Sequence, residues 1–275
     1  MNDNLSGINI ADILKVAKGA GDEIMDVYGT DFAIEEKEDR TPLTLADKRS
    51  HELILRNLSR LHPNIPILSE EGNDIPYSKR KRWKYLWLVD PLDGTKEFIN
   101  RNGEFTVNIA LIQDSKPVLG VIYIPVSNIF YYAKKGSGAY RLAGNKMDEK
   151  SNNAHKIIEI SAELPLSDSQ NRPFTIVGSR SHMSNETEEY IHKLVKVSGE
   201  VRIITAGSSI KLCMVADGRA DVYPRFGPTM EWDIAAGQIL VEEGGGKVIK
   251  AETGEPLRYN KEDLLNPWFI VEKNA

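Results

Sequence analysis

Cysteine is almost absent from this sequence, and so are the long apolar runs of a membrane protein. Cys213 is the only cysteine among the 275 residues, so no disulfide can form within the chain, which fits a reducing compartment. We expect Cys213 to be a small buried hydrophobic residue. No apolar run approaches the roughly 20 residues that span a bilayer, and the N-terminus lacks the basic and apolar blocks of a signal peptide. We therefore expect a cytoplasmic protein.

An excess of positive charge is also missing. The chain has 35 Lys and Arg residues against 40 Asp and Glu residues, a formal net charge of −5 and a pI near 5.7. A general nucleic-acid-binding surface would normally be strongly basic, so we expect no nucleic-acid partner. Any phosphate ligand must then be met by a few local cations or by a metal ion.

The order of sequence patterns divides the chain into two parts. Residues 1–163 show helical periodicity followed by apolar runs between turn residues, which indicates an α+β half with antiparallel strands. Residues 164–275 alternate short apolar runs with helical segments, which indicates an α/β half. A chain of this length can bury one large core or two closely packed ones.

The predicted elements follow from these patterns. We expect helices at 10–28, 45–61, 185–197, from about 208, and from 231 to the glycines at 244–246. We expect strands at 32–37, 65–69, 85–89, 105–113, 118–125, 129–133, 174–177, 201–204 and 220–223. The segment 144–156 should be exposed or disordered. Gly19 and Gly21 weaken the first helix by about 1 kcal/mol each.

The stretch Asp90-Pro91-Leu92-Asp93-Gly94-Thr95 follows one of the apolar runs. Pro91 restricts φ and Gly94 tolerates angles that other residues avoid, so the sequence predicts a tight turn that brings Asp90 and Asp93 together. Carboxylates held this close repel unless a cation lies between them, and hard oxygen ligands suit Mg²⁺. A short helix after the turn would leave the amides of Gly94 and Thr95 for an anion.

Ordinary interpretations compete with a metal site here. An isolated aspartate pair of this spacing is more often an acidic turn, in which Asp90 caps a helix and Asp93 faces water. An EF-hand does not fit, because its ligands occupy alternate positions and end in a Glu at position 12. The rest of the chain has to decide between the two remaining interpretations.

Four further acidic residues stand at the ends of predicted elements. Glu70 and Glu71 follow the strand at 65–69, and at most one of them should join a site because neighbours on an extended chain point opposite ways. Asp47 lies in the first turn of the helix that Thr44 can cap, and Asp233 lies in the first turn of the helix at 231. Acids in a first turn also complement the helix dipole without any ligand.

Polar and cationic residues follow the strands of the second half. His182, Ser208, Lys211 and Arg225 lie in the turns after these strands, where ligands bind in α/β layers. Lys211 and Arg225 are candidates for phosphate contacts, and His182 can hydrogen-bond to a base or stack on it. The ordinary alternative for each is an exposed surface residue.

The sequence resembles a known family of phosphatases. Glu70, the stretch from Asp90 to Thr95 and the segment 232–237, in this order and at these separations, resemble the inositol monophosphatase superfamily of metal-dependent, lithium-sensitive phosphatases. Within it, "YLWLVDPLDGTKEFINRNGEFTVNIALI", "GSSIKLCMVADGRADVYPRFGPTMEWDIAAG" and "LSEE" are most similar to the 3'(2'),5'-bisphosphate nucleotidases of the CysQ type. The likeness covers nearly the whole chain.

The resemblance implies a fold and a role for each site residue. The fold would be a layered αβαβα sandwich with the active site between the two halves. Glu70, Asp90, the main-chain carbonyl of Leu92, Asp93 and Asp233 would hold two or more Mg²⁺ ions, with Asp90 bridging two of them. Asp47 and Thr95 would activate the attacking water, and the amides of Gly94 and Thr95 would hold the scissile phosphate. The nucleotide pocket would be lined by His182, Ser208, Lys211 and Arg225, with Glu70, Leu92, Asp93 and Asp233 also in contact with substrate.

The implied reaction is hydrolysis of the 3'-phosphate of adenosine 3',5'-bisphosphate to AMP and phosphate, a step linked to sulfate assimilation and nucleotide recycling. Two alternatives stay open. The chain can be an inositol or sugar phosphate phosphatase of the same superfamily, with the same metal core and a different pocket. From another class, it can be a non-catalytic module that binds Mg²⁺ or nucleotide, although Asp47 and Thr95 would then lack a purpose.

The expected partner is a small-molecule substrate. Some members of the CysQ type are described as loosely attached to the inner membrane, so peripheral association with its cytoplasmic face stays an alternative to a free cytoplasmic location. Either a monomer or a homodimer is compatible with the sequence.

Overall fold

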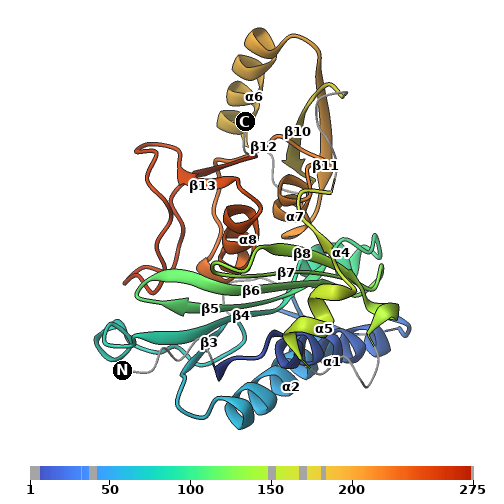
Figure 1. Ribbon diagram of the computed structural model, residues 1–275, viewed down its shortest axis with the longest axis vertical. Coiled ribbons are helices and arrows are strands. Elements are labelled where there is room, and N and C mark those ends of the chain that lie inside the picture. The colour runs from blue at the N-terminus through green and yellow to red at the C-terminus, as the bar shows by residue number, and fades with distance from the viewer. Residues whose placement is uncertain are drawn as a thin grey trace.

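Five layers of helix and sheet stack in the order αβαβα in this computed structural model (Figure 1). The structure describes residues 7–31, 33–36, 42–147, 153–166, 172–180 and 184–273, with the backbone alone at 34–36, 42, 43 and 197. The layered sandwich expected from the sequence is confirmed. Among these residues no helix combines the length and the apolar character needed to cross a bilayer.

The outer layer of the first half consists of two long helices that have the predicted bounds. α1 spans Ile10–Tyr28 and α2 spans Leu45–Leu61. Each starts where a local side chain can satisfy a free backbone N–H, since Asn9 accepts from Ala11 N and Thr44 accepts from Ala46 N. A two-stranded ribbon, β1 (Ile34–Glu36) and β2 (Pro42–Thr44), precedes α2. The short helix α5 (Ala154–Glu159) packs beside α1.

The first sheet has seven strands in the order β3-β4-β5-β6-β7-β8-β9, of which β3 and β4 are parallel and the other pairs antiparallel. The strands are β3 (Ile67–Ser69), β4 (Tyr85–Asp93), β5 (Thr106–Gln113), β6 (Lys116–Ile124), β7 (Ile129–Lys134), β8 (Ala139–Ala143) and β9 (Ala162–Glu163). The short helices α3 (Tyr77–Arg80) and α4 (Thr95–Ile99) flank β4 in sequence.

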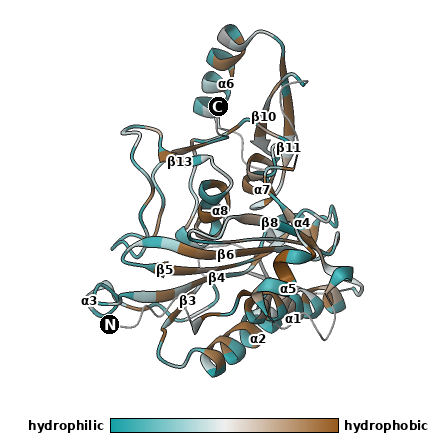
Figure 2. Cartoon of the chain, in the orientation of Figure 1, coloured by the Kyte–Doolittle hydropathy of each residue, from teal (hydrophilic) through white to brown (hydrophobic). Residues whose placement is uncertain are grey.

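Both faces of this sheet are covered, which explains why its strands are apolar at consecutive positions (Figure 2). Along β4, Trp87 and Val89 pack in the core formed with α1 and α2. Leu86 and Leu88 point to the opposite face and pack in a second core that contains Ile234 of the next layer.

The middle layer holds α7 (Ile210–Ala216) and α8 (Glu231–Glu243). Every residue of α8 from Ile234 to Val241 is buried, because the first sheet lies on one side of this helix and α7 and the second sheet lie on the other. A helix without a polar face is expected in such a position. Its one buried amide, Gln238, accepts from the hydroxyl of Tyr259 at 2.6 Å and donates to Glu242 at 2.8 Å.

The second sheet has five strands in the order β11-β10-β12-β14-β13, and α6 (Asn185–Ser198) covers its outer face. The strands are β10 (Phe174–Ser179), β11 (Val201–Ala206), β12 (Val222–Arg225), β13 (Lys247–Lys250) and β14 (Phe269–Glu272). Strands β10, β11 and β12 are parallel. The α/β character predicted for the second half is therefore confirmed for these three strands.

Two expectations were wrong. The predicted tight turn at Asp90 to Asp93 is a continuation of β4 with an irregular register, because the pairing with β5 resumes at Asp93. The polar segment 144–156 is not uniformly a loop, since α5 begins at Ala154 and Gly144 is buried. The sequence patterns also missed the strands β2, β8, β9, β13 and β14 and the short helix α3.

Candidate active site

A β-bulge brings Asp90 and Asp93 to the same face of the first sheet. Asp90 pairs with Asn108 and Asp93 pairs with Thr106, so β4 carries one more residue than β5 across this interval. In a regular strand, residues three apart point to opposite faces. The extra residue corrects the alternation, and Pro91 is well placed in it because proline cannot donate to a strand ladder. Both carboxylates therefore line one cavity.

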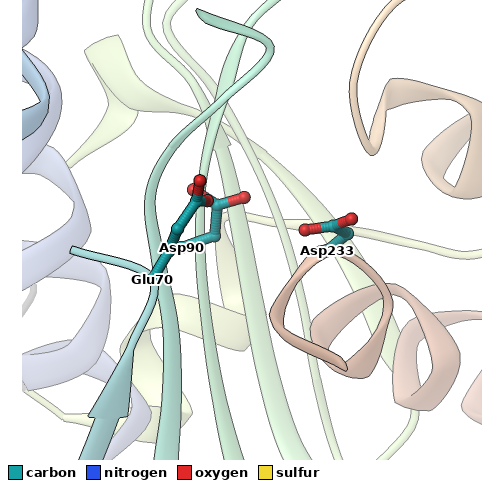
Figure 3. Close-up of side chains that lie close together, drawn as sticks. All are labelled: Glu70, Asp90 and Asp233. Carbon is teal, nitrogen blue, oxygen red and sulfur yellow. The ribbon is translucent and has the colours of Figure 1, made fainter. Parts of the chain in front are cut away.

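Three carboxylates from distant parts of the chain meet at this cavity (Figure 3). One oxygen each of Glu70, Asp90 and Asp233 lie within 4.8 Å of one another. Glu70 follows β3, Asp90 belongs to β4, and Asp233 comes from the first turn of α8 in the second half. Glu71 is not among the residues that line the cavity, so one glutamate of the pair reaches the site, as expected. The reason differs from the one expected, because both glutamates lie in a turn closed by the bond from Gly72 N to the Ser69 carbonyl at 3.0 Å and not on an extended chain.

The electrostatics of the three carboxylates favour a cation. Burial raises the pKa of Asp90 well above its ordinary value, and the charges of Glu70, Asp93, Asp233 and Asp47 add to this effect. The pKa of Asp233 is raised by burial and by Asp93 and Glu70. Ionised carboxylates this close need a positive charge between them, and a set of hard oxygen donors fits a divalent cation such as Mg²⁺. These residues can therefore hold a metal ion.

The start of α8 fixes Asp233 in place. Its Oδ2 accepts from the backbone N–H of Met230 at 2.8 Å, so Asp233 completes the helix start and also faces the cavity. Two residues earlier, the fully buried Glu231 accepts from the backbone N–H groups of Asn260 and Lys261 and from the Lys261 ammonium. The structure confirms Asp233 as an acid at the helix start, and its role as a metal ligand stays a prediction that its position at the cavity allows.

Asp47 and Thr95 lie beside each other at the same site. Oδ2 of the buried Asp47 accepts from the backbone N–H and the hydroxyl of Thr44 at 2.8 and 2.6 Å. Its Oδ1 lies 3.4 Å from the Thr95 hydroxyl, which is also 3.4 Å from the Leu92 carbonyl oxygen. Gly94, between Leu92 and Thr95 in sequence, has φ +93°, a conformation that favours glycine.

Asp93 lines the cavity but is not one of the three carboxylates within 4.8 Å. Its Oδ2 is occupied by protein donors, because Ser209 N and the Ser208 hydroxyl lie 2.6 and 2.7 Å away and Asn108 Nδ2 lies 3.3 Å away. Ser208 was predicted to line the nucleotide pocket, and it does line the cavity. The structure adds its bond to Asp93.

Two buried cations line the same cavity, whose volume is about 320 Å³. Lys211 belongs to α7 and Arg225 to β12, and both side chains are almost fully buried. Burial lowers the pKa of Lys211 to about 8, and its ammonium donates to the carbonyls of Ala206 and Ser208. Arg225 donates to the Pro228 carbonyl at 2.8 Å. His182 lies outside the described residues.

The sequence patterns missed three polar residues behind Asp93. Thr106 and Asn108 are buried on β5, and Ser209 precedes α7. The signal that could have found them is the pair of polar residues at alternate positions of the otherwise apolar stretch "FTVNIALI". Buried polar side chains of this kind require hydrogen-bond partners.

Comparisons with known proteins show the family of the chain. Residues 8–273 match the model of the Inositol monophosphatase family. The chain is 44% identical over 263 residues to the proteins named 3'(2'),5'-bisphosphate nucleotidase CysQ from Salmonella typhimurium and from Escherichia coli K12, covering 94% of this chain and 97% of each relative.

Solved structures give the same result. A crystal structure of CysQ from Bacteroides thetaiotaomicron, described as a bacterial member of the inositol monophosphatase family, has 50% identity and a TM-score of 0.87 over 97% of both chains. The extragenic suppressor protein suhB from Bartonella henselae has 26% identity and a TM-score of 0.74 over 97% of this chain and 93% of its own. The chain belongs to the inositol monophosphatase family.

Proposed function

We propose that this chain is a 3'(2'),5'-bisphosphate nucleotidase that hydrolyses the 3'-phosphate of adenosine 3',5'-bisphosphate to AMP and phosphate. The observation that carries the proposal is a single cavity that combines an acidic cluster with two buried cations. The cluster suits the scissile phosphate together with metal ions. Lys211 and Arg225 suit a second phosphate. The relatives that share 44% identity carry the same activity in their names.

The metal ligands follow from the residues around the cluster. Glu70, Asp90, the carbonyl of Leu92, Asp93 and Asp233 would hold two or more Mg²⁺ ions. When bound, Mg²⁺ would acidify a water and neutralise negative charge on the attacking and leaving oxygens. Four carboxylates balance two dications, so the donor set and the ions agree in charge.

Asp47 and Thr95 would handle the proton of the attacking water. Asp47 Oδ1 is the acceptor, because Oδ2 is already occupied by Thr44. The Thr95 hydroxyl stands between Asp47 and the Leu92 carbonyl and would orient the water towards phosphorus. The amides of Gly94 and Thr95, at the start of α4, would bind the phosphate oxygens.

The remaining pocket residues would hold the rest of the nucleotide. Lys211 and Arg225 would pair with the 5'-phosphate, and Ser208 and His182 would contact the ribose and the base. In the reaction, the water oxygen forms a bond to phosphorus, the bond to the 3'-oxygen breaks, and that oxygen takes up a proton. No covalent phosphoenzyme forms. Uncatalysed phosphomonoester hydrolysis is so slow that enzymes accelerate it by up to about 10²¹-fold, which requires this degree of charge stabilisation.

We also infer a cytoplasmic location and a small-molecule partner. The single, buried and free Cys213 supports a reducing compartment. The net charge of −5 argues against nucleic acid as a partner.

Phosphate release from three substrates tests the function. Adenosine 3',5'-bisphosphate, inositol 1-phosphate and fructose 1,6-bisphosphate are compared with Mg²⁺, each with and without excess chelator. We expect chelator-sensitive turnover of the nucleotide with kcat/KM at least about tenfold above the others, equivalent to about 1.4 kcal/mol. A preference for inositol or sugar phosphate would keep the metal chemistry and overturn the pocket assignment. Absence of release from all three would favour a binding module.

A further inference from the structure

The protein commits one oxygen of Asp93 entirely to hydrogen bonds. Asp93 Oδ2 accepts from Ser209 N at 2.6 Å, from the Ser208 hydroxyl at 2.7 Å and from Asn108 Nδ2 at 3.3 Å. Asn108 belongs to the first half of the chain, whereas both serines belong to the second. Asp93 is thus held jointly by the two halves.

The side chains that donate to Asp93 are themselves joined through one hydroxyl. Thr106 is completely buried, and its Oγ1 lies 2.7 Å from the Ser208 hydroxyl oxygen, 2.8 Å from that of Ser209 and 3.0 Å from Asn108 Oδ1. The Ser209 hydroxyl also donates to Asn108 Oδ1 at 2.8 Å. Four polar side chains therefore form one closed network behind a single carboxylate oxygen.

The number of hydroxyl and amide protons in this network determines which groups donate and which accept. A carboxylate only accepts and each hydroxyl has one proton, so the Ser208 proton is used on Asp93. Asn108 turns its amide nitrogen towards Asp93, which leaves its oxygen for the hydroxyls of Thr106 and Ser209. Thr106 then donates to Ser208, Ser209 or Asn108. Each route ends on Asp93 Oδ2, because Ser209 passes its own proton on to Asn108. Without the Thr106 hydroxyl, both side-chain donors lose their common support.

The backbone at Ser208 needs such support. Ser208 has φ +52°, a left-handed conformation that costs energy for a residue other than glycine and persists only when its surroundings fix it. In the described part of the loop, the Ser208 side chain bonds to Asp93 and Thr106. The loop conformation and the orientation of Asp93 thus depend on the same contacts.

We propose that Thr106 is a positioning residue, which through Ser208 and Asn108 holds Asp93 so that Oδ2 is bound to protein and Oδ1 is left for the metal site. This inference rests on the proposed function, in which Asp93 is a metal ligand. Partners behind a metal ligand commonly contribute about 10- to 100-fold to metal affinity. Thr106 never touches substrate or metal in this scheme.

Three substitutions and a matched control test the inference. Thr106→Val keeps the shape of the side chain and removes the hydroxyl, whereas Thr106→Ser keeps the hydroxyl. The control is Thr175→Val, which removes another buried threonine hydroxyl. Thr175 lies on β10 and its hydroxyl donates to the Pro173 carbonyl at 2.9 Å. Asp93→Asn reports whether Asp93 binds metal at all. Mg²⁺ affinity is measured by calorimetry on metal-free protein, with circular dichroism and thermal unfolding recorded for each variant.

We expect Thr106→Val to bind Mg²⁺ roughly tenfold or more weakly, and its turnover at low Mg²⁺ to recover when Mg²⁺ is in excess. Thr106→Ser should stay within about threefold of wild type, which is under 1 kcal/mol in affinity. Thr175→Val should lose thermal stability without loss of Mg²⁺ affinity. If Thr106→Val does not fold, Ser209→Ala tests the same network, because it keeps the backbone donor to Asp93 and should still weaken Mg²⁺ binding.

The outcomes separate this inference from the proposed function. Weak Mg²⁺ binding by Asp93→Asn with normal binding by Thr106→Val would overturn the positioning role and leave the metal site intact. Normal Mg²⁺ binding by Asp93→Asn would overturn both the positioning role of Thr106 and the assignment of Asp93 as a metal ligand. Equal losses of Mg²⁺ affinity in Thr106→Val and Thr175→Val would mean that Thr106 contributes only to general stability, and this would overturn the inference.

Discussion

Asp47 uses its two oxygens for two separate purposes. Oδ2 accepts from Thr44 and completes the start of α2, while Oδ1 faces Thr95 in the cavity. From the sequence, two interpretations of Asp47 compete, namely an acid that complements the start of a helix and a carboxylate that activates the attacking water. The structure confirms the role in the helix start, and the contact of Oδ1 with Thr95 leaves the catalytic role as a prediction that is compatible with it.

Two substitutions of Asp47 should separate stability from catalysis. Asp47→Asn keeps an oxygen for the contacts with Thr44, so it should lose less free energy of unfolding than Asp47→Ala, yet an amide cannot accept the water proton. We expect kcat to fall about 10²- to 10⁴-fold. Asp47→Ala should lose the same activity and also about 1 kcal/mol of stability. Urea unfolding and phosphate release measure the two effects, and near-normal turnover by Asp47→Asn would rule out the base role.

The sequence predicts the acidic residues of the site better than their neighbours. Glu70 and Asp233 could be proposed because they stand at the ends of elements whose periodicity is clear. Asp90 and Asp93 were chosen for a turn that does not exist, and their convergence depends on a bulge in the pairing with β5. The serines at 208 and 209 reach Asp93 from more than 100 residues away, which no local pattern encodes.

At the scale of elements, α1 shows two glycines with opposite roles. A Cβ at Gly19 would lie 3.4 Å from the nearest methyl group of Leu53, an ordinary contact, whereas a Cβ at Gly21 would lie 2.3 Å from the ring of Tyr123. That ring cannot move aside easily, because it stacks on Phe130 at 4.2 Å and its hydroxyl bonds Asn128 at 2.9 Å. Gly21 is therefore needed where α1 crosses β6, and Gly19 is not.

Alanine at these two positions should change stability in opposite directions. Gly19→Ala should stabilise the protein by about 0.5–1 kcal/mol, since alanine favours helix over glycine. Gly21→Ala gains the same propensity but meets the Tyr123 ring, and overpacking of this kind costs about 1–3 kcal/mol. Urea unfolding of both variants measures the difference, and each serves as the control for the other. Equal shifts in the same direction would contradict the packing argument.

Elements were predictable where their signals are local. The bounds of α1 and α2 follow from an apolar period and a capping residue that lie within a few positions. By contrast, β13 and β14 pair with each other across nearly 20 residues, and β14 also pairs with β12. Their sequences are short and lack a regular alternation, so only the tertiary partners define them as strands.

At the scale of the whole molecule, the two halves share one core. Leu88 and Ile122 of the first sheet belong to the same buried cluster as Ile234 and Leu240 of α8 and Phe269 of β14. The boundary expected between residues 163 and 164 stays a prediction, and it runs through this shared cluster, although the core formed with α1 and α2 belongs to the first half alone. Arg80 adds a polar link, since its buried guanidinium donates to the Asn260 side chain and to the carbonyls of Lys261 and Glu262.

A shared core predicts that neither half folds alone. The fragment 1–163 would expose the sheet face that α8 covers, which includes the buried residues Leu86, Leu88, Ala110, Ile122 and Tyr131. An exposed apolar face of this kind leads to association or to a loosely packed state. We expect the fragment to bind a hydrophobic dye and to lack near-ultraviolet circular dichroism.

The full chain should accordingly unfold in one cooperative step. If α8 separates from the first sheet, the second sheet also loses the buried cluster that it shares with α8. Far-ultraviolet circular dichroism and tryptophan fluorescence should give coincident urea transitions, which is the test for two-state unfolding. Arg80→Leu, which removes the link to the 260–262 loop, should lower the stability of both sheets together and leave a single transition. Two separated transitions, or a fragment 1–163 with native-like packing, would show that the halves are independent domains and that the active site forms only when they dock.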